Sequence, residues 1–387
     1  MGLRSYLDRI RPTFSPGGRL AKLHSTFDAF ETFLYVPPTV TSRGSHIRDA
    51  VDMKRTMIVV VVALLPALVF GMYNVGLEHA RMVGETIAFW PALGFGLLQV
   101  LPTMVVSYVV GLGIEFGVAQ ARGHEVNEGF LVSGMLIPMV LPVGVPLWMV
   151  ALATAFAVIF GKEVFGGTGM NVFNPALVAR AFLFFAFPRY MSGDGVWVAG
   201  AGVEQAVQGF SGATPLSYAA SGVEHLPPVT DLFMGYIPGS VGETSVLMVL
   251  IGAAILLLSG VGNFRVMFSA FAGAMLMGLL FNAVGSNEYM RIPAYYHLLM
   301  GGFAFGAVFM ATDPVTGAQT RLGQWIYGLL IGVFAVLVRV LNPAYPEGMM
   351  LSILLMNAFA PLIDYLVVQR NVRARNRRAA RVAAAQA

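Results

Sequence analysis

Long apolar runs separated by short polar stretches recur through most of this 387-residue chain. A helix needs roughly 20 apolar residues to cross the hydrocarbon core of a bilayer, and several of the runs reach that length. Only 11% of the residues are charged and 57% are hydrophobic, whereas about 25% are charged in an ordinary soluble domain. The sequence therefore predicts an all-α polytopic membrane protein and excludes a water-soluble fold.

The apolar runs predict about ten transmembrane helices. They lie at 56–75, 92–118, 130–143, 147–163, 172–187, 244–261, 264–284, 295–312, 322–341 and 348–369. The segments 130–143 and 172–187 are short for a complete crossing, which favours broken, half-length or re-entrant helices there. A division into five plus five segments would relate two halves by inversion, as in many transporters, although no clear internal repeat is visible.

The positive charges predict the orientation of these segments. Nineteen Lys and Arg residues lie at the two ends of the chain and in alternate loops on one side. Only Arg81, Arg189 and Arg291 lie on the other side. By the positive-inside rule, both termini are cytoplasmic. The first apolar segment should stay in the membrane rather than be cleaved as a signal, because residues 1–55 are basic and hold no long apolar run.

Five regions follow from this arrangement. They are a cytoplasmic N-terminal segment with an amphipathic helix (1–55), a first transmembrane half (56–187), an outward loop (188–243), a second transmembrane half (244–369) and a basic cytoplasmic tail (370–387). The outward loop holds five acidic residues, one Arg, and many aromatic and apolar residues. Because loops longer than about 15 residues are usually functional or disordered, this composition favours a folded, functional loop.

Several kinds of site are excluded by what the chain lacks. It has no cysteine, which rules out disulfides, thiolate ligation of zinc or of an iron–sulfur cluster, and a cysteinyl flavin bond. Its six histidines are scattered without an i, i+4 pair, so we expect no metal held by side chains. The basic residues flank apolar segments and form no aromatic-studded face, so we expect no nucleic-acid partner. No strand–GxGxxG–helix unit for a dinucleotide is present.

A short motif of small residues lies in the outward loop, at Ser211-Gly212-Ala213-Thr214. Small residues around a hydroxyl group leave an open backbone that a bulky group can approach closely. The same residue types, with Pro215 after them, also make ordinary turns. From composition alone the turn is favoured.

The motif resembles the flavin-transferase motif, in which the phosphate of FMN is esterified to the final threonine. The chain as a whole resembles the B subunits of the bacterial sodium-translocating NADH:quinone oxidoreductases. The strings that carry the resemblance are 45–52 (SHIRDAVD), 124–129 (HEVNEG), 162–169 (KEVFGGTG), 174–177 (NPAL) and 340–350 (VLNPAYPEGMM). A tetrapeptide alone is a weak indication, but together with these strings it is a strong one.

The resemblance implies a membrane component of a respiratory complex that oxidises NADH, reduces ubiquinone and moves sodium ions outward across the bacterial inner membrane. It implies a covalent FMN at Thr214, attached by a flavin transferase on the outer face, and a non-covalent riboflavin. It also implies a partner flavoprotein that binds NADH. One position departs from the family pattern, because Gln208 stands where an acidic residue is usual, with Glu204 nearby. This departure bears on the efficiency of attachment and not on its site.

Polar residues at membrane depth are the other candidate sites, because ionisable groups there are costly and usually functional. Glu115 and Asp364 lie near the cytoplasmic ends of their segments, where we expect a partly wet position. A hard cation such as sodium prefers carboxylate oxygens, so both are candidates for the ion path, with partner subunits as the alternative source. Arg180 and Arg339 are interpreted as structural, either snorkelling or paired with an acid.

Two asparagines and two glycines complete the candidates. Asn171 and Asn174 lie at a glycine-rich break before a short segment, where their amides are expected to contact riboflavin. Asn174 followed by Pro175 also fits a plain helix N-cap. Gly111 and Gly113 are candidates for a quinone site, with close helix packing as the alternative.

Two rival functions use the same scaffold. The D component of the related Rnf complex shares the flavin motif but exchanges electrons between ferredoxin and NAD. The long basic N-terminal segment and the full set of strings favour the quinone reductase instead. A solute transporter or channel without redox chemistry would have no use for the motif at Thr214.

Overall fold

The computed structural model describes most of the chain. The described residues are 3–15, 17–24, 26–28, 31, 35, 43–45, 53–123, 129–200, 211–221, 226–342 and 345–386. Regular secondary structure within these ranges is helical throughout, without a strand. The all-α prediction is therefore confirmed for this part of the chain.

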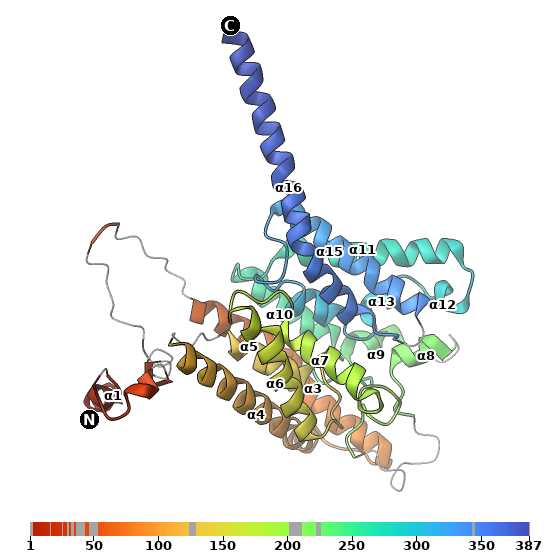
Figure 1. Cartoon of the computed structure of the whole chain (residues 1–387). Helices are drawn as coiled ribbons and strands as arrows, with labels where there is room; N and C mark the ends of the chain where they lie inside the picture. Colours follow the sequence, from red (N-terminus) through yellow and green to blue (C-terminus); the bar gives the residue numbers. More distant parts are fainter. Residues whose placement is uncertain are drawn as a thin grey trace.

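Six helices of the described part are long and apolar enough to cross a membrane. They are α3 (Met53–Val83), α4 (Phe89–Arg122), α6 (Leu147–Gly161) with the 3-10 turn η2 (Glu163–Phe165), α11 (Phe264–Val284), α15 (Arg321–Leu341) and α16 (Met349–Gln386). Helix α16 carries the basic tail away from the bundle as one continuous helix (Figure 1). The polytopic prediction is confirmed by these helices.

Three further apolar helices are too short for a full crossing. They are α5 (Phe130–Met139), α7 (Pro175–Ala186) and α10 (Val246–Leu258). The first two fall in the segments that the sequence marks as short. Helix α10 is shorter than the predicted segment 244–261, because its N-cap is Ser245 and the chain turns at Gly260, whose φ is +73°.

The predicted segment 295–312 is broken into pieces. It contains α13 (Tyr296–Leu299), α14 (Phe303–Phe305) and the π-helical turn η5 (Gly306–Met310). The chain breaks at Gly301, where φ is +62°. All residues from Phe303 to Met310 are buried. Single π-helical turns of this kind occur frequently at functional sites.

The long helices pack in two groups that meet at α10 and α7. Helix α4 packs against α3 and α6, while α15 packs against α11 and α16. Helix α10 packs on α3, and α7 contacts both α6 and α16. Close approach depends on small residues, since a Cβ added at Gly332 of α15 would overlap the backbone of α11 at Ala270.

Short helices and 3-10 turns lie at the two ends of the bundle. They are α1 (Leu3–Phe14), η1 (Ala21–Leu23), η3 (Pro188–Tyr190), α8 (Pro215–Ser221), α9 (Val229–Met234) and α12 (Glu288–Arg291). Figure 1 shows α1 on the opposite side of the bundle from α8 and α9. The amphipathic helix expected in residues 1–55 falls partly outside the described residues. In the described part, the ring of Phe27 stacks on Phe14 of α1, with centroids 4.7 Å apart.

Candidate functional site

Two cavities lie at opposite ends of α7 and α10. The Thr214 cavity has an empty volume of about 890 Å³ and is bordered by Thr214, Arg180, Phe184 and Thr244 among others. The Asn174 cavity has an empty volume of about 970 Å³ and is bordered by Asn171, Asn174, Pro175, Leu256 and Asp313 among others. Twelve residues separate Thr244 from Leu256, which corresponds to roughly 18 Å along a helix.

Thr214 lies at the start of α8, immediately before Pro215. Its side-chain oxygen accepts a hydrogen bond from the Ser217 backbone N–H at 3.3 Å. Ser211 is exposed, and its hydroxyl accepts from the Ala213 backbone N–H at 3.3 Å. The motif therefore forms a tight turn that presents a half-buried threonine to the cavity.

The structure leaves no room for a side chain at Gly212, the glycine of the motif. A Cβ added at Gly212 would overlap the backbone carbonyl oxygen of Asp194, which also borders the Thr214 cavity. Gln208 and Glu204, which the sequence analysis connects with the expected flavin attachment, lie outside the described residues.

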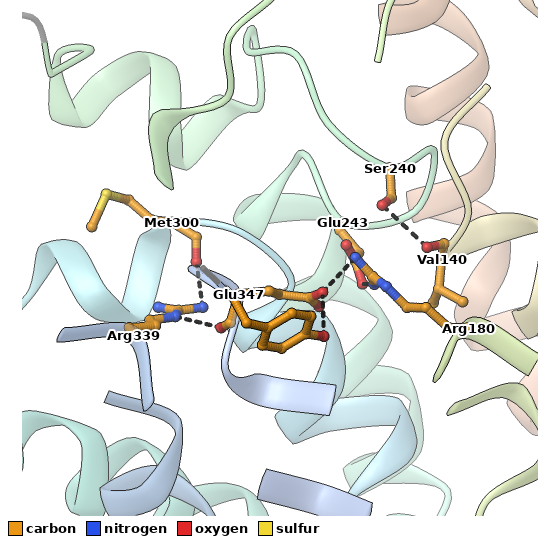
Figure 2. A network of polar contacts seen from close by, with 8 residues as sticks. Val140, Arg180, Ser240, Glu243, Met300, Arg339 and Glu347 are labelled. Atoms are coloured by element: carbon orange, nitrogen blue, oxygen red, sulfur yellow. Dashed lines mark hydrogen bonds and ion pairs between the residues drawn. The ribbon is translucent and has the colours of Figure 1, made fainter. Parts of the chain in front are cut away.

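A buried cluster of charges forms one wall of the Thr214 cavity (Figure 2). Arg180 of α7 donates one N–H to Glu243 at 2.5 Å and another to Glu347 at 2.6 Å. The side chains of Arg180 and Glu243 are 6% and 8% exposed. Burial raises the pKa of the Glu243 carboxyl, which precedes α10, and the neighbouring guanidinium opposes this shift. The cluster joins three segments that are distant in the sequence.

A second arginine supports the broken segment beside this cluster. Arg339 of α15 donates to the backbone carbonyls of His297 at 2.6 Å and Met300 at 3.0 Å. Its Nε donates to the backbone carbonyl of Glu347 at 2.7 Å. The bonds to His297 and Met300 satisfy carbonyl groups that the interrupted helix leaves without helical partners, and the bond to Glu347 ties the segment before α16 to the same guanidinium. Arg180 pairs with acids as expected, whereas the side chain of Arg339 binds carbonyls.

The structure brings Asn171 and Asn174 together at the Asn174 cavity. Asn174 is the N-cap of α7, since its Oδ1 accepts from the backbone N–H groups of Ala176 at 3.0 Å and Leu177 at 3.4 Å. The N-cap prediction is confirmed. The Nδ2 of Asn171 donates to the Phe173 carbonyl at 3.2 Å.

Asp313 belongs to this cavity and is absent from the candidates that the sequence indicates. Its carboxylate accepts from the Val315 backbone N–H at 3.0 Å and the Thr316 hydroxyl at 3.1 Å. Nδ2 of Asn174 lies 3.5 Å from the Asp313 carboxylate. The residue lies directly after the apolar segment 295–312 and is followed by a proline, as Asn174 is near the start of its own segment. That parallel is the one feature of the sequence that could have indicated it.

The partly wet position expected for Glu115 is wrong, because helix packing buries it. Its carboxylate forms an ion pair with Lys162, and both side chains are only 4% exposed. Asp364 has a different role, because it accepts from the backbone N–H groups of Gln319 at 2.7 Å and Thr320 at 3.0 Å. It thereby ties α16 to the start of α15. The two candidate carboxylates contact different pairs of elements.

Gly111 and Gly113 have different surroundings. A Cβ at Gly111 would overlap the ring of Phe130, so this glycine serves close packing. Gly113 is exposed, and a Cβ there would meet no atom within 4 Å. The structure does not bring the two glycines into one site. Among the described residues, no three His, Cys, Asp or Glu side chains are grouped to hold a metal ion.

Comparison with protein families matches residues 40–373 to the NQR2, RnfD, RnfE family. The chain belongs to this family. Near full-length relatives are known from several bacteria. The B subunit of the Na(+)-translocating NADH-quinone reductase of Chromohalobacter salexigens is 46% identical, covering 98% of this chain and 97% of its own length. The proteins of the same name from Pseudomonas aeruginosa and Klebsiella pneumoniae are 46% and 44% identical, over 97% and 98% of this chain.

Membership of the NQR2, RnfD, RnfE family confirms the resemblance drawn from the sequence strings. Three of those strings, 124–129, 162–169 and 174–177, form part of the wall of the Asn174 cavity through Gly129, Lys162, Thr168 and Asn174. Part of a fourth, at 345–347, borders the Thr214 cavity. Four of the five strings that carry the resemblance therefore reach the two cavities.

Proposed function

We propose that this chain is the membrane-embedded B subunit of a sodium-translocating NADH:quinone reductase. The observation that carries this proposal is the 44–46% identity, over nearly the whole chain, to proteins with that name. The family also includes RnfD and RnfE, so a ferredoxin–NAD complex is the second candidate. The names of the near full-length relatives favour the quinone reductase.

We propose Thr214 as the residue that carries FMN through a phosphoester bond. Thr214 borders an open cavity, the kind of concave surface in which ligands usually bind. Its wall offers apolar surface together with the Arg180 and Glu243 pair, which supplies a donor and an acceptor for a polar ring edge. Bound FMN would supply one-electron and two-electron transfer at this position.

We propose the Asn174 cavity as the riboflavin site. Its border is mostly apolar with a few polar groups, as in most ligand sites. Oδ1 of Asn174 is used in capping α7, and one N–H of its Nδ2 faces Asp313 at 3.5 Å, so the second N–H is the group left to donate a hydrogen bond to a ligand. Asn171 and Thr168 add polar groups on the same wall.

We propose that quinone approaches α4 beside Gly113, where the surface is open, and not at Gly111, which Phe130 covers.

The positive-inside rule supports cytoplasmic termini and a multi-pass chain in the bacterial inner membrane. The other members of the complex would include the NADH-binding flavoprotein, and a flavin transferase would act at Thr214 on the outer side. NADH supplies the electrons, ubiquinone accepts them, and sodium is the transported ion.

The covalent flavin is tested by Thr214→Ala in a host that expresses the flavin transferase. We expect the denatured wild-type chain to show flavin fluorescence on a gel and the mass of one FMN less one water. Thr214→Ala should lose both. Ser221→Ala is the matched control, because its hydroxyl bonds only backbone carbonyls of the same short helix. A wild-type chain without flavin would contradict the redox function and favour a plain transporter.

The choice between the two redox complexes needs a separate measurement. Membranes that contain this chain should show NADH:quinone activity stimulated by sodium, and membranes from a deletion strain should not. Ferredoxin-dependent reduction of NAD that disappears with the chain would favour the Rnf-type complex instead.

A further inference from the structure

Lys162 lies between a buried carboxylate and the Asn174 cavity. Its Nζ donates to the Oε1 of Glu115 on α4, and both side chains are 4% exposed. The same lysine borders the Asn174 cavity. Its Nζ is also 6.0 Å from the ring centroid of Phe130, which covers the neighbouring Gly111. One ammonium group is thus shared between an ion pair and a cavity wall.

The position of Lys162 in the chain suits a side chain that moves. It lies between the end of α6 at Gly161 and the start of η2 at Glu163, with φ −132° and ψ −61°. Its backbone is therefore outside regular helix, and its side chain is not fixed by a helical register. Four carbons separate its ammonium from the backbone, which gives the charge a wide reach.

Another ion pair already holds the same two elements together. Arg122 of α4 pairs with Glu163 of η2 at 3.7 Å, and the Arg122 side chain is 43% exposed. It also donates to the Glu163 backbone carbonyl at 3.1 Å. A buried ion pair is weak support for stability, because desolvation offsets most of its attraction. Holding α4 to η2 therefore does not explain the buried pair of Lys162 and Glu115.

The charges that border the Asn174 cavity indicate what would separate Lys162 from Glu115. Lys162 is the basic side chain among the described residues that border the Asn174 cavity, and Asp313 is the acidic one. Within the described residues, no Lys, Arg or His forms an ion pair with Asp313. Negative charge added to this cavity would attract the Lys162 ammonium away from Glu115. The vacated carboxylate would then be an unpaired buried charge, which is costly until another cation arrives.

We propose that Lys162 is a tethered counter-cation that occupies the cation position at Glu115 and exchanges with a sodium ion when negative charge enters the Asn174 cavity. This rests on the proposed function for the source of that charge, which is an electron from NADH. The exchange is electroneutral: the added electron is balanced by the lysine, and the lysine's place at Glu115 is taken by one sodium ion. Departure of the electron returns Lys162 to Glu115 and releases the ion.

The first test uses the purified, oxidised complex and needs no turnover. A ligand that binds only the folded state raises the unfolding temperature as its concentration rises. In wild type, Lys162 occupies Glu115, so we expect sodium to raise the unfolding temperature only slightly more than the same concentration of potassium does. Lys162→Met should bind sodium about tenfold more tightly or better, because the competing cation is gone. The double variant Lys162→Met with Glu115→Gln should lose this gain.

The second test measures the sodium concentration that gives half-maximal NADH:quinone activity. We expect Lys162→Met to lower it and Lys162→Arg to raise it, since a guanidinium binds a carboxylate with two parallel hydrogen bonds. Shifts in opposite directions separate competition from a loss of structure. Arg122→Met, which removes the exposed pair on the same elements, is the matched control and should leave the value unchanged.

Two results would overturn the proposal. One is equal sodium dependence in wild type, Lys162→Met and Lys162→Arg when all three are folded and flavin-loaded. The other is a sodium-specific stabilisation that persists in the double variant, which would place the ion elsewhere. If wild type has no NADH:quinone activity, the proposed function fails, and the unfolding measurement alone still decides the site.

Discussion

Arg180 carries the positive charge between the buried carboxylate of Glu243 and the partly buried carboxylate of Glu347 at the Thr214 cavity (Figure 2). Breaking a buried ion pair by removing one partner typically costs about 3–5 kcal/mol, because a buried charge is left without compensation. We therefore expect Arg180→Met to lower the unfolding temperature of the detergent-solubilised protein markedly. Arg189→Met, an exposed arginine just beyond α7, should change stability by no more than about 0.5 kcal/mol. Equal unfolding temperatures for the two variants would contradict the structural role of Arg180.

The candidate residues that the sequence could place are those whose partners lie nearby in the chain. Asn171 and Asn174 both follow one glycine-rich break and lie three positions apart, so their common site follows from local geometry. The partners of Arg180 could not be named in advance, because Glu243 lies 63 positions away. The partner of Glu115 lies 47 positions away, across two helices. Membrane depth indicates that a charge needs a partner, but only the packing of helices decides which one.

The length of an apolar run predicts that a helix is present, but it does not predict where that helix is interrupted. The six long helices coincide with long apolar runs, as hydropathy requires. The break at Gly301 and Gly302 is invisible to hydropathy, because apolar residues continue on both sides. What permits the break is a donor from another element, Arg339, which binds the carbonyls that the interruption frees. Such compensation is tertiary, so the sequence of segment 295–312 alone does not contain it.

The two roles of Asn174, as helix cap and as cavity wall, can be separated at the level of the element. Asn263 caps α11 in the same way, with its Oδ1 accepting from the Arg265 backbone N–H at 3.1 Å. Replacing either cap by alanine should cost about 1 kcal/mol of stability. Only Asn174→Ala should also reduce the non-covalent flavin, measured by extracting the folded complex and quantifying released riboflavin. Equal flavin content in Asn174→Ala and Asn263→Ala would remove Asn174 from the proposed site.

At the scale of the whole molecule, α7 and α10 each reach from one cavity to the other. Helix α7 presents Asn174 at its start and Arg180 further along, while Thr244 precedes α10 and Leu256 lies near its end. The broken segment follows the same course, with Gly301 at the Thr214 cavity and Phe309 at the Asn174 cavity. The helices that connect the cavities are therefore the short or interrupted ones. In a membrane, irregular backbone is tolerated where it is buried in protein or lines a cavity.

The orientation of these cavities across the membrane is a prediction that the chain is well suited to test. It contains no cysteine, so a single introduced thiol reports on one position without background from this chain. Ser221→Cys places the thiol at the end of α8 near Thr214, and Ala380→Cys places it on the exposed basic end of α16. We expect a membrane-impermeant maleimide, applied to cells whose outer membrane is permeabilised, to label position 221 in intact inner membranes. Position 380 should react only after the inner membrane is opened.

The reverse labelling pattern would place Thr214 in the cytoplasm, and the positive-inside assignment would then be wrong. Labelling of both positions in sealed membranes would mean that the membranes leak. Flavin fluorescence of Ser221→Cys provides the control for folding, because the proposed attachment at Thr214 would require the transferase to reach the same face. A labelled and flavin-loaded Ser221→Cys chain would fix the side of the Thr214 cavity. It would leave the Asn174 cavity, at the far ends of α7 and α10, facing the cytoplasmic side, as the proposed uptake of sodium requires.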